Sequence, residues 1–234
     1  MPIDYTLLKG LHILLAIIWL GTDVGTMVSF KGLLNPRYQI STRLAMSRLS
    51  DLMDMGPRSA LVLLLMLGIY LTYRGEWGLS GPVGAVLAGA SAVVGVLWFA
   101  GVWHQYWVGH AHVSDPRQIA FQRYFRVFDI WWRVTVSSLL AVAALYSLVA
   151  PGSGPFNATW LSIKLILFAG IVMLGAYLRV LLPKIGGAVG AIVKNGSSPE
   201  REAALQAPSR QATYAVWGIW VLIVVIIFLA VAKF

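Results

Sequence analysis

Three side chains that could do chemistry share one face of the first apolar segment. His12, Trp19 and Asp23 are separated by seven and then four residues, which places them on one side of a helix with 3.6 residues per turn. Between Leu11 and Phe30, His12 and Asp23 are the only ionisable residues. Because lipid penalises both groups, this face is predicted to point into a helix bundle, where it could hold a metal or move protons.

The composition is that of an integral membrane protein. Of the 234 residues, 59% are hydrophobic and 12% are charged, and the mean hydropathy is +0.76, a mixture that a soluble domain could not keep in water. The 18 Lys and Arg residues are spread beside apolar stretches, so the net charge of +9 indicates membrane orientation and not a nucleic-acid partner. The absence of Cys excludes disulfides, Cys-ligated iron–sulfur clusters and covalent c-type haem attachment. A redox cofactor would therefore be held by His, Met, Lys, Tyr or carboxylate side chains.

The hydropathy pattern predicts an all-α bundle of about six transmembrane helices in one domain, residues 1–234. The predicted spans cover about 5–30, 58–74, 82–107, 128–150, 157–182 and 211–232. A segment over 36–55, started by Asn35-Pro36, is amphipathic, and Gly56-Pro57 is predicted to kink or break the helix there. The stretch from Pro183 to Arg210 contains Gly, Ser and Pro and is predicted to be a loop.

The basic residues predict the orientation of these spans. Fourteen of the 18 Lys and Arg lie in or beside the first, third and fifth connections, and only Lys9, Arg74, Lys164 and Lys233 lie on the other side. Under the positive-inside rule, both termini are predicted to be non-cytoplasmic. The sequence therefore predicts a multi-pass protein of the bacterial inner (cytoplasmic) membrane, with the lipid bilayer as its surroundings.

Depth then decides which candidate ligands can meet. His12 is near the outer surface, and Lys164 lies about seven residues into its span, which is ~10 Å below the outer end. A buried lysine tends to lose its proton, and the neutral amine can ligate a metal. His104 is more than twenty residues into its span, roughly 30 Å from the outer end, so His12 and His104 cannot share one haem.

Simpler roles compete with each of these candidates. His12 could be hydrogen-bonded across the bundle, and Lys164 could reach the outer headgroups. Asp23 is predicted to be either a proton relay or the partner of an arginine. His104 is a candidate for a second haem or metal site, although solvation at the interface is the simpler and favoured explanation of His104, His110 and His112. Asp129 and Arg133 are one turn apart and can pair.

Two short motifs resemble a known family. Lys9-x-x-His12 with Trp19, and Trp160-Leu161-Ser162-Ile163-Lys164, are similar to segments of the HemJ and CopD-like superfamily of small membrane proteins. The resemblance implies that His12 and Lys164 hold the iron of one b-type haem, supported by Trp19 and Trp160, and it covers a little under half of the chain. HemJ-type proteins oxidise protoporphyrinogen, and CopD-like members are associated with copper handling.

The chain also departs from this family. Its third and fourth spans look like an addition to a four-helix pattern, and the Pro-Arg and terminal His that close the family's first helix are not at the end of this one. The resemblance therefore implies haem binding by this chain more strongly than it implies protoporphyrinogen oxidation.

Three functions follow as hypotheses. The first is a cytochrome b-like oxidoreductase or electron-transfer protein that acts on a porphyrin or quinone and exchanges electrons with a partner protein. The second is copper transport or delivery through His and Met side chains. The third is a cofactor-free subunit that anchors a larger membrane complex.

Overall fold

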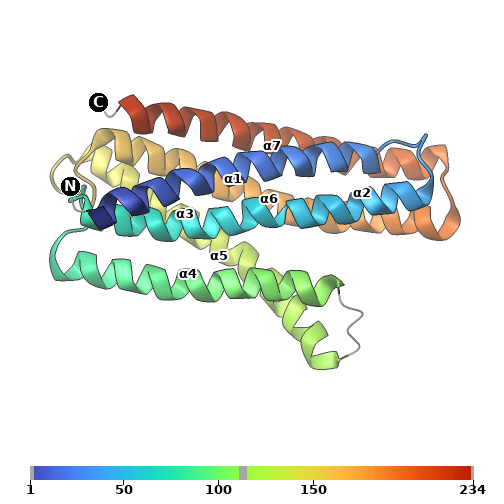
Figure 1. The fold of residues 1–234 in the computed structure, drawn as a ribbon, viewed down its shortest axis with the longest axis horizontal. Helices are drawn as coiled ribbons and strands as arrows, with labels where there is room; N and C mark the ends of the chain where they lie inside the picture. The colour runs from blue at the N-terminus through green and yellow to red at the C-terminus, as the bar shows by residue number, and fades with distance from the viewer. Residues whose placement is uncertain (1–2, 111–114, 233–234) are drawn as a thin grey trace.

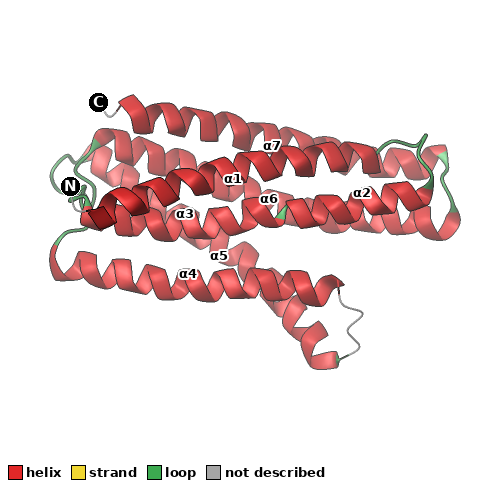
Figure 2. Ribbon diagram, in the orientation of Figure 1, coloured by secondary structure: helices red, strands yellow, loops and turns green. Residues whose placement is uncertain are grey.

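The computed structural model describes residues 3–110 and 115–232, and these residues form a bundle of long helices (Figures 1 and 2). In the described ranges there is no strand, only an isolated bridge between Gly78 and Phe156. His112 lies outside the described residues. The helices are α1 (Ile3–Leu33), α2 (Ile40–Met53), α3 (Met55–Arg74), α4 (Gly81–His110), α5 (Pro116–Val149), α6 (Thr159–Asn195) and α7 (Pro199–Ala232).

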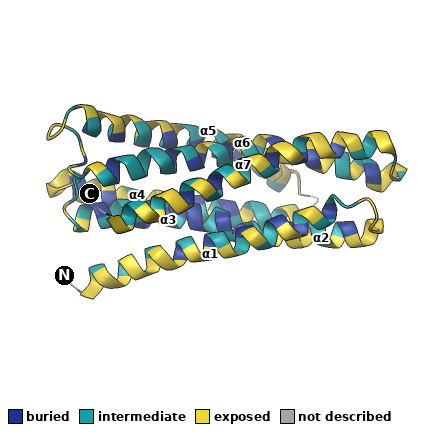
Figure 3. Ribbon diagram, turned by 90° about the horizontal axis from the view of Figure 1, so that it is seen from above, coloured by how far each residue is buried: buried dark blue, intermediate teal, exposed yellow. Residues whose placement is uncertain are grey.

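The prediction of an all-α membrane protein is confirmed. With α2 and α3 taken together, six helical elements are long and apolar enough to cross a membrane. The first residues of α1 and the last of α7 lie at the same end of the molecule (Figure 1), as an even number of crossings requires. Exposed residues run along all the helices (Figure 3), and many of them are large and apolar, as contact with lipid demands.

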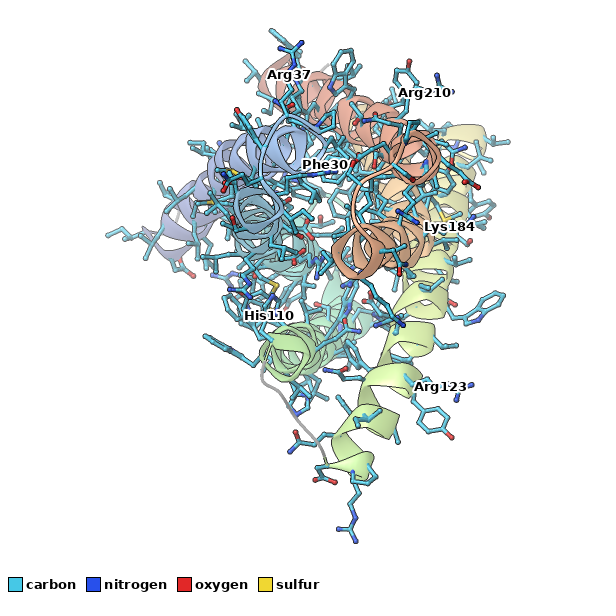
Figure 4. The ribbon with its side chains drawn as sticks, turned by 90° about the vertical axis from the view of Figure 1, so that its right-hand side faces the viewer. Phe30, Arg37, His110, Arg123, Lys184 and Arg210 are labelled. Atoms are coloured by element: carbon cyan, nitrogen blue, oxygen red, sulfur yellow. The ribbon has the colours of Figure 1, made fainter. Side chains whose placement is uncertain are left out.

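Neighbouring helices in the chain form most of the packing. α1 packs on α2 and α3, α3 on α4, α5 on α6, and α6 on α7. The first turns of α5 point away from the bundle in two views (Figures 1 and 4). Side chains from six of the seven helices meet in the main core. Among its buried members are Leu15, Trp19, Leu61, Trp98, Phe125, Ile171 and Ile219.

The amphipathic segment differs slightly from its prediction. α2 begins at Ile40 and not near residue 36, because the Asn35 side chain accepts a hydrogen bond from the Arg37 amide and forms a turn. The predicted break lies at Asp54, which alone separates α2 from α3, and not at Gly56-Pro57, which belong to α3. Pro57 lies in the first turn of α3, where a missing N–H leaves no hydrogen bond unmade.

The predicted loop from Pro183 to Arg210 is wrong. α6 continues through Pro183 to Asn195, and α7 begins at Pro199 and contains Pro208. Each proline removes a backbone hydrogen bond, but the two helix ends bury apolar side chains against each other, which offsets that loss. The residues buried there are Leu181, Ile185, Ile192, Leu205 and Ala212.

The fourth predicted span also starts earlier than expected. α5 begins at Pro116 and not near residue 128. The Asp115 side chain caps it by accepting a hydrogen bond from the Arg117 amide, and Pro116 occupies the first helical position. Residues 116–127, which lie between two predicted spans, are instead the start of a helix, and most of them are exposed.

The connections at the terminal end of the molecule are tied together. The Asn157 amide and side chain donate to the carbonyls of Trp77 and Glu76 at 3.1 Å each. Gly78 adopts φ +143°, and a Cβ there would collide with the Pro155 carbonyl, so only glycine allows this contact. The start of α4 is thereby fixed against the start of α6.

Candidate functional site

Two helices supply the predicted site, each through a single stripe of side chains. On α1 the stripe runs from Leu8 through His12 to Trp19, and both Leu8 and Trp19 belong to the main core. On α6 it runs from Lys164 through Phe168 to Ile171, and the last two also belong to that core. The family-like motifs therefore lie on helix faces that look toward the inside of the bundle.

His12 stands in this core without a hydrogen-bond partner for its Nδ1 atom. That nitrogen is buried, and the His12 Cε1 atom lies 3.5 Å from the position that a Cβ on Gly68 of α3 would take. The predicted hydrogen bond of His12 across the bundle is therefore not made from Nδ1. A buried imidazole with an unused nitrogen is costly, and ligation is one way to use it.

Lys164 lies near enough to His12 for its charge to act on the imidazole. This influence relates the two motif residues, which lie on α1 and α6, and their joint ligation of one iron stays a prediction. Trp160, one turn before Lys164, contacts Trp77 edge-on at 5.3 Å between ring centroids. Trp160 belongs to the cluster of buried side chains under the outer connections and helps to fix the start of α6.

His104 does not join this pair. It is exposed on α4, and its ring contacts Phe121 edge-on at 4.9 Å. Within the described residues, no group of three or more His, Asp or Glu side chains could hold a metal ion. His104 therefore stays a prediction that no second side chain supports.

A cavity lies below His12 on the same stripe of α1. Its wall includes Trp19 and Asp23, which is buried and accepts a hydrogen bond from the Trp220 Nε1 atom of α7 at 2.8 Å. One prediction for Asp23 is a pair with an arginine, but its partner in the structure is the Trp220 indole. The space between the lining side chains is about 950 Å³, including the part that opens to the surroundings.

Most of the cavity wall is apolar, and its charges are grouped. The apolar side chains come from α1, α3, α6 and α7, and Phe30 packs among the ends of α6 and α7 at the basic end of the molecule (Figure 4). The charged side chains on the wall are Asp23, Asp51, Asp54, Arg58, Arg133 and Arg179.

Asp129 is the centre of a buried ion network behind this wall. The predicted pair with Arg133 is confirmed, with 3.0 Å between Arg133 Nε and Asp129 Oδ2. Arg179 of α6 reaches the same oxygen at 3.2 Å, and Trp98 of α4 donates to the other oxygen at 2.7 Å. The Arg133 guanidinium also lies over the Trp98 ring, 5.3 Å from its centroid. One carboxylate therefore holds α4, α5 and α6 together.

A second pair closes the cavity on the α3 side. Arg58 pairs with Asp54, four residues earlier, across the break between α2 and α3. Asp51 is half exposed at the rim, and its carboxylate lies 3.9 Å from the His110 Nε2 atom of α4.

The sequence pattern did not single out Arg179 or Trp220 as site residues. Arg179 counted only as one of the positive charges at the inner end, although it lies inside the apolar run 165–182. An arginine within a span is a signal for a buried partner or a ligand. Trp220 gave no such signal, because tryptophans are common in membrane helices.

A comparison with known protein families, characterised proteins and solved structures finds no match to this chain. The resemblance to the HemJ and CopD-like superfamily therefore remains an expectation from the two motifs.

Proposed function

We propose that this protein is a haem-binding oxidoreductase or electron-transfer protein of the bacterial inner membrane, with both termini outside the cytoplasm. It would resemble HemJ-type protoporphyrinogen oxidases and use a porphyrin or quinone as substrate. The observation that carries the proposal is the buried Nδ1 atom of His12, which has no hydrogen-bond partner and belongs to a ring within electrostatic reach of Lys164.

The residues present fit a b-type haem. His12 offers an unpartnered nitrogen on α1 and Lys164 an amine on α6, and these two would hold the iron. Gly68 lies close to the imidazole ring, because a Cβ there would be 3.5 Å from the His12 Cε1 atom. When bound, haem would supply a one-electron couple, and the core around it would tune the potential by excluding water.

The chain's own residues would supply the remaining parts of the reaction. Trp19, two turns after His12 on α1, is 4% exposed, and it forms part of the cavity wall. Asp23, one turn further, would hold or release a proton at its carboxylate, and the Trp220 N–H fixes the orientation of that group. An electron donor or acceptor protein would dock from outside the bundle.

An absorption spectrum of the detergent-purified protein, oxidised and reduced, tests the proposal. After expression with ample haem, we expect a Soret band that His12→Ala abolishes. The matched control is His104→Ala, because His104 is exposed and should leave the band unchanged. A wild-type protein without a Soret band, or equal haem content in both variants, would refute haem binding at His12.

Metal analysis of the same sample separates the copper alternative. Stoichiometric copper without iron would favour transport or delivery. The methionines do not favour that reading: Met53 packs near Gly25, and Met46 packs near Gly32, in the α1–α2 contact. Partner proteins that co-purify without any chromophore would instead favour an anchoring subunit.

A further inference from the structure

Two arginines on the wall of the cavity beside Trp19 each have a guanidinium nitrogen without a hydrogen-bond partner. Arg133 and Arg179 each bond Asp129 through Nε, while the Nη2 atom of each is buried without a hydrogen-bond partner. Their side chains are 3% and 11% exposed. A buried guanidinium nitrogen that bonds nothing is costly, and both of these belong to side chains on the cavity wall.

The two guanidiniums approach the same part of the wall. Arg133 crosses from α5 to α6, where its Nη1 atom lies 3.5 Å from the position of a Cβ on Gly175. Arg179 is one turn after Gly175 on α6. Two donors side by side match the two oxygens of one carboxylate.

The unpartnered donors, and not an excess of positive charge, indicate a ligand with one anionic group. The charged groups of this region are three arginines and four carboxylates: Arg58, Arg133, Arg179, Asp23, Asp51, Asp54 and Asp129. The anionic group of the ligand is therefore inferred from the two Nη2 atoms that have no hydrogen-bond partner.

The remaining residues of the wall indicate that the rest of such a ligand is apolar. Beyond the arginines, the cavity is lined by apolar side chains from four helices. A small hydrophilic anion would leave these surfaces unfilled, whereas a hydrocarbon chain or ring would cover them. Apolar members of the wall include Leu61, Ile171, Leu178, Leu182 and Ile219.

We propose that this cavity binds an amphipathic monocarboxylate, with the carboxylate on the Nη2 atoms of Arg133 and Arg179 and the apolar body against α6 and α7. The site is separate from His12 and does not depend on haem.

Equilibrium binding of radiolabelled laurate to the protein in an uncharged detergent tests this site. We expect the wild type to bind laurate, and Arg179→Met to bind it about tenfold or more weakly, because a charge-assisted hydrogen bond is lost. Dodecanol, which has the same chain without the charge, should bind equally to both proteins. Arg123→Met is the matched control, since Arg123 is exposed on α5 and points away from the bundle (Figure 4).

Two further ligands test the chemistry of the anion. Acetate at the same concentration should not displace laurate, and dodecyl phosphate should bind no more tightly than laurate. Displacement by acetate would refute the proposal that the ligand needs an apolar body. Tighter binding of dodecyl phosphate would refute the proposal that its anionic group is a carboxylate. Equal laurate binding by wild type and Arg179→Met would overturn the site itself.

A second variant covers the case in which Arg179→Met does not fold. Gly175→Leu fills the wall beside the guanidiniums and leaves every charge in place, so it should abolish laurate binding while the protein stays folded. Normal laurate binding by folded Gly175→Leu would contradict the proposal. His12→Ala should bind laurate like the wild type, which separates a failure here from a failure of the haem proposal.

Discussion

Polar side chains are arranged differently in the two halves of the bundle: the half next to the chain termini, here called the outer half, and the opposite half, here called the inner half. In the outer half, His12 has a buried nitrogen without a partner, and the ion pair between Arg74 and Asp4 is exposed. In the inner half, charged side chains are buried and shared among several helices, as around Asp129. The same stripes of α1 and α6 pass through both layers: His12 and Asp23 are ~16 Å apart along α1 by helical rise.

This difference shows where stability and ligand binding reside. A compensated ion network holds helices together, and removing one member leaves the others charged and unpaired. A lone imidazole contributes little to stability, so it can be kept for ligation. We therefore expect mutations in the inner half to act mainly on folding, and those beside His12 mainly on cofactor content.

The largest expected effect is that of Asp129→Ala. It leaves two buried guanidiniums and the Trp98 N–H without their acceptor, and breaking such a buried pair costs about 3–5 kcal/mol. Thermal unfolding in detergent should show a large drop in Tm or loss of folded protein. His12→Ala is the comparison from the outer layer and should lower Tm only slightly; equal drops would erase the contrast between the halves.

The next effect is that of Glu202→Ala at the inner end of α7. Glu202 accepts two hydrogen bonds from Arg43, at 2.6 and 3.0 Å, and Arg43 also donates to the Leu33 carbonyl at 2.7 Å. Because Glu202 keeps some exposure, we expect a loss of about 2–3 kcal/mol, below the full cost of a buried pair.

Asp4→Ala provides the matched control for that measurement. The Asp4–Arg74 pair has a similar length of 2.8 Å but is exposed, so its loss should cost less than about 1 kcal/mol. A Tm for Asp4→Ala as low as that for Glu202→Ala would show that burial does not separate the two pairs.

A third prediction concerns the space beside His12. Gly68→Leu places a branched side chain against the imidazole, and overpacking of this kind costs about 1–3 kcal/mol. The Soret absorbance per protein should fall several-fold. Gly68→Ala should retain haem, because its Cβ would lie at an ordinary 3.5 Å from His12.

Gly89→Leu is the control for the added bulk. Gly89 is exposed on α4, with nothing within 4 Å of a Cβ there, so this variant should keep its haem. Equal haem loss in Gly68→Leu and Gly89→Leu would count against a cofactor site beside His12.

The smallest effect is expected at Asp23. Asp23→Ala removes the acceptor of the Trp220 N–H and should cost about 1 kcal/mol, whereas Asp23→Asn keeps an acceptor oxygen and should unfold close to the wild type. If Asp23 handles protons, Asp23→Asn should also weaken the pH dependence of the haem reduction potential. A potential that shifts with pH as in the wild type would exclude that role.

The outer site was easier to predict than the inner one for a physical reason. His12 and Trp19 share one helix, and helical periodicity is visible in the sequence, so their common face followed from spacing. The pairing of Asp129 with Arg133 followed in the same way, from residues one turn apart. The prolines at 183 and 208 misled the prediction, because their cost was weighed without the apolar contacts between α6 and α7 that offset it.

The sequence by itself determined the all-helical membrane class, because hydrophobic length and composition act locally along each span. It also determined which faces of α1 and α6 carry polar groups. Only the tertiary structure decided that Arg179 shares Asp129 with Arg133, and that Trp220 and not an arginine bonds Asp23. These contacts join helices far apart in the chain, and their geometry depends on how the helices cross, which no spacing along one helix contains.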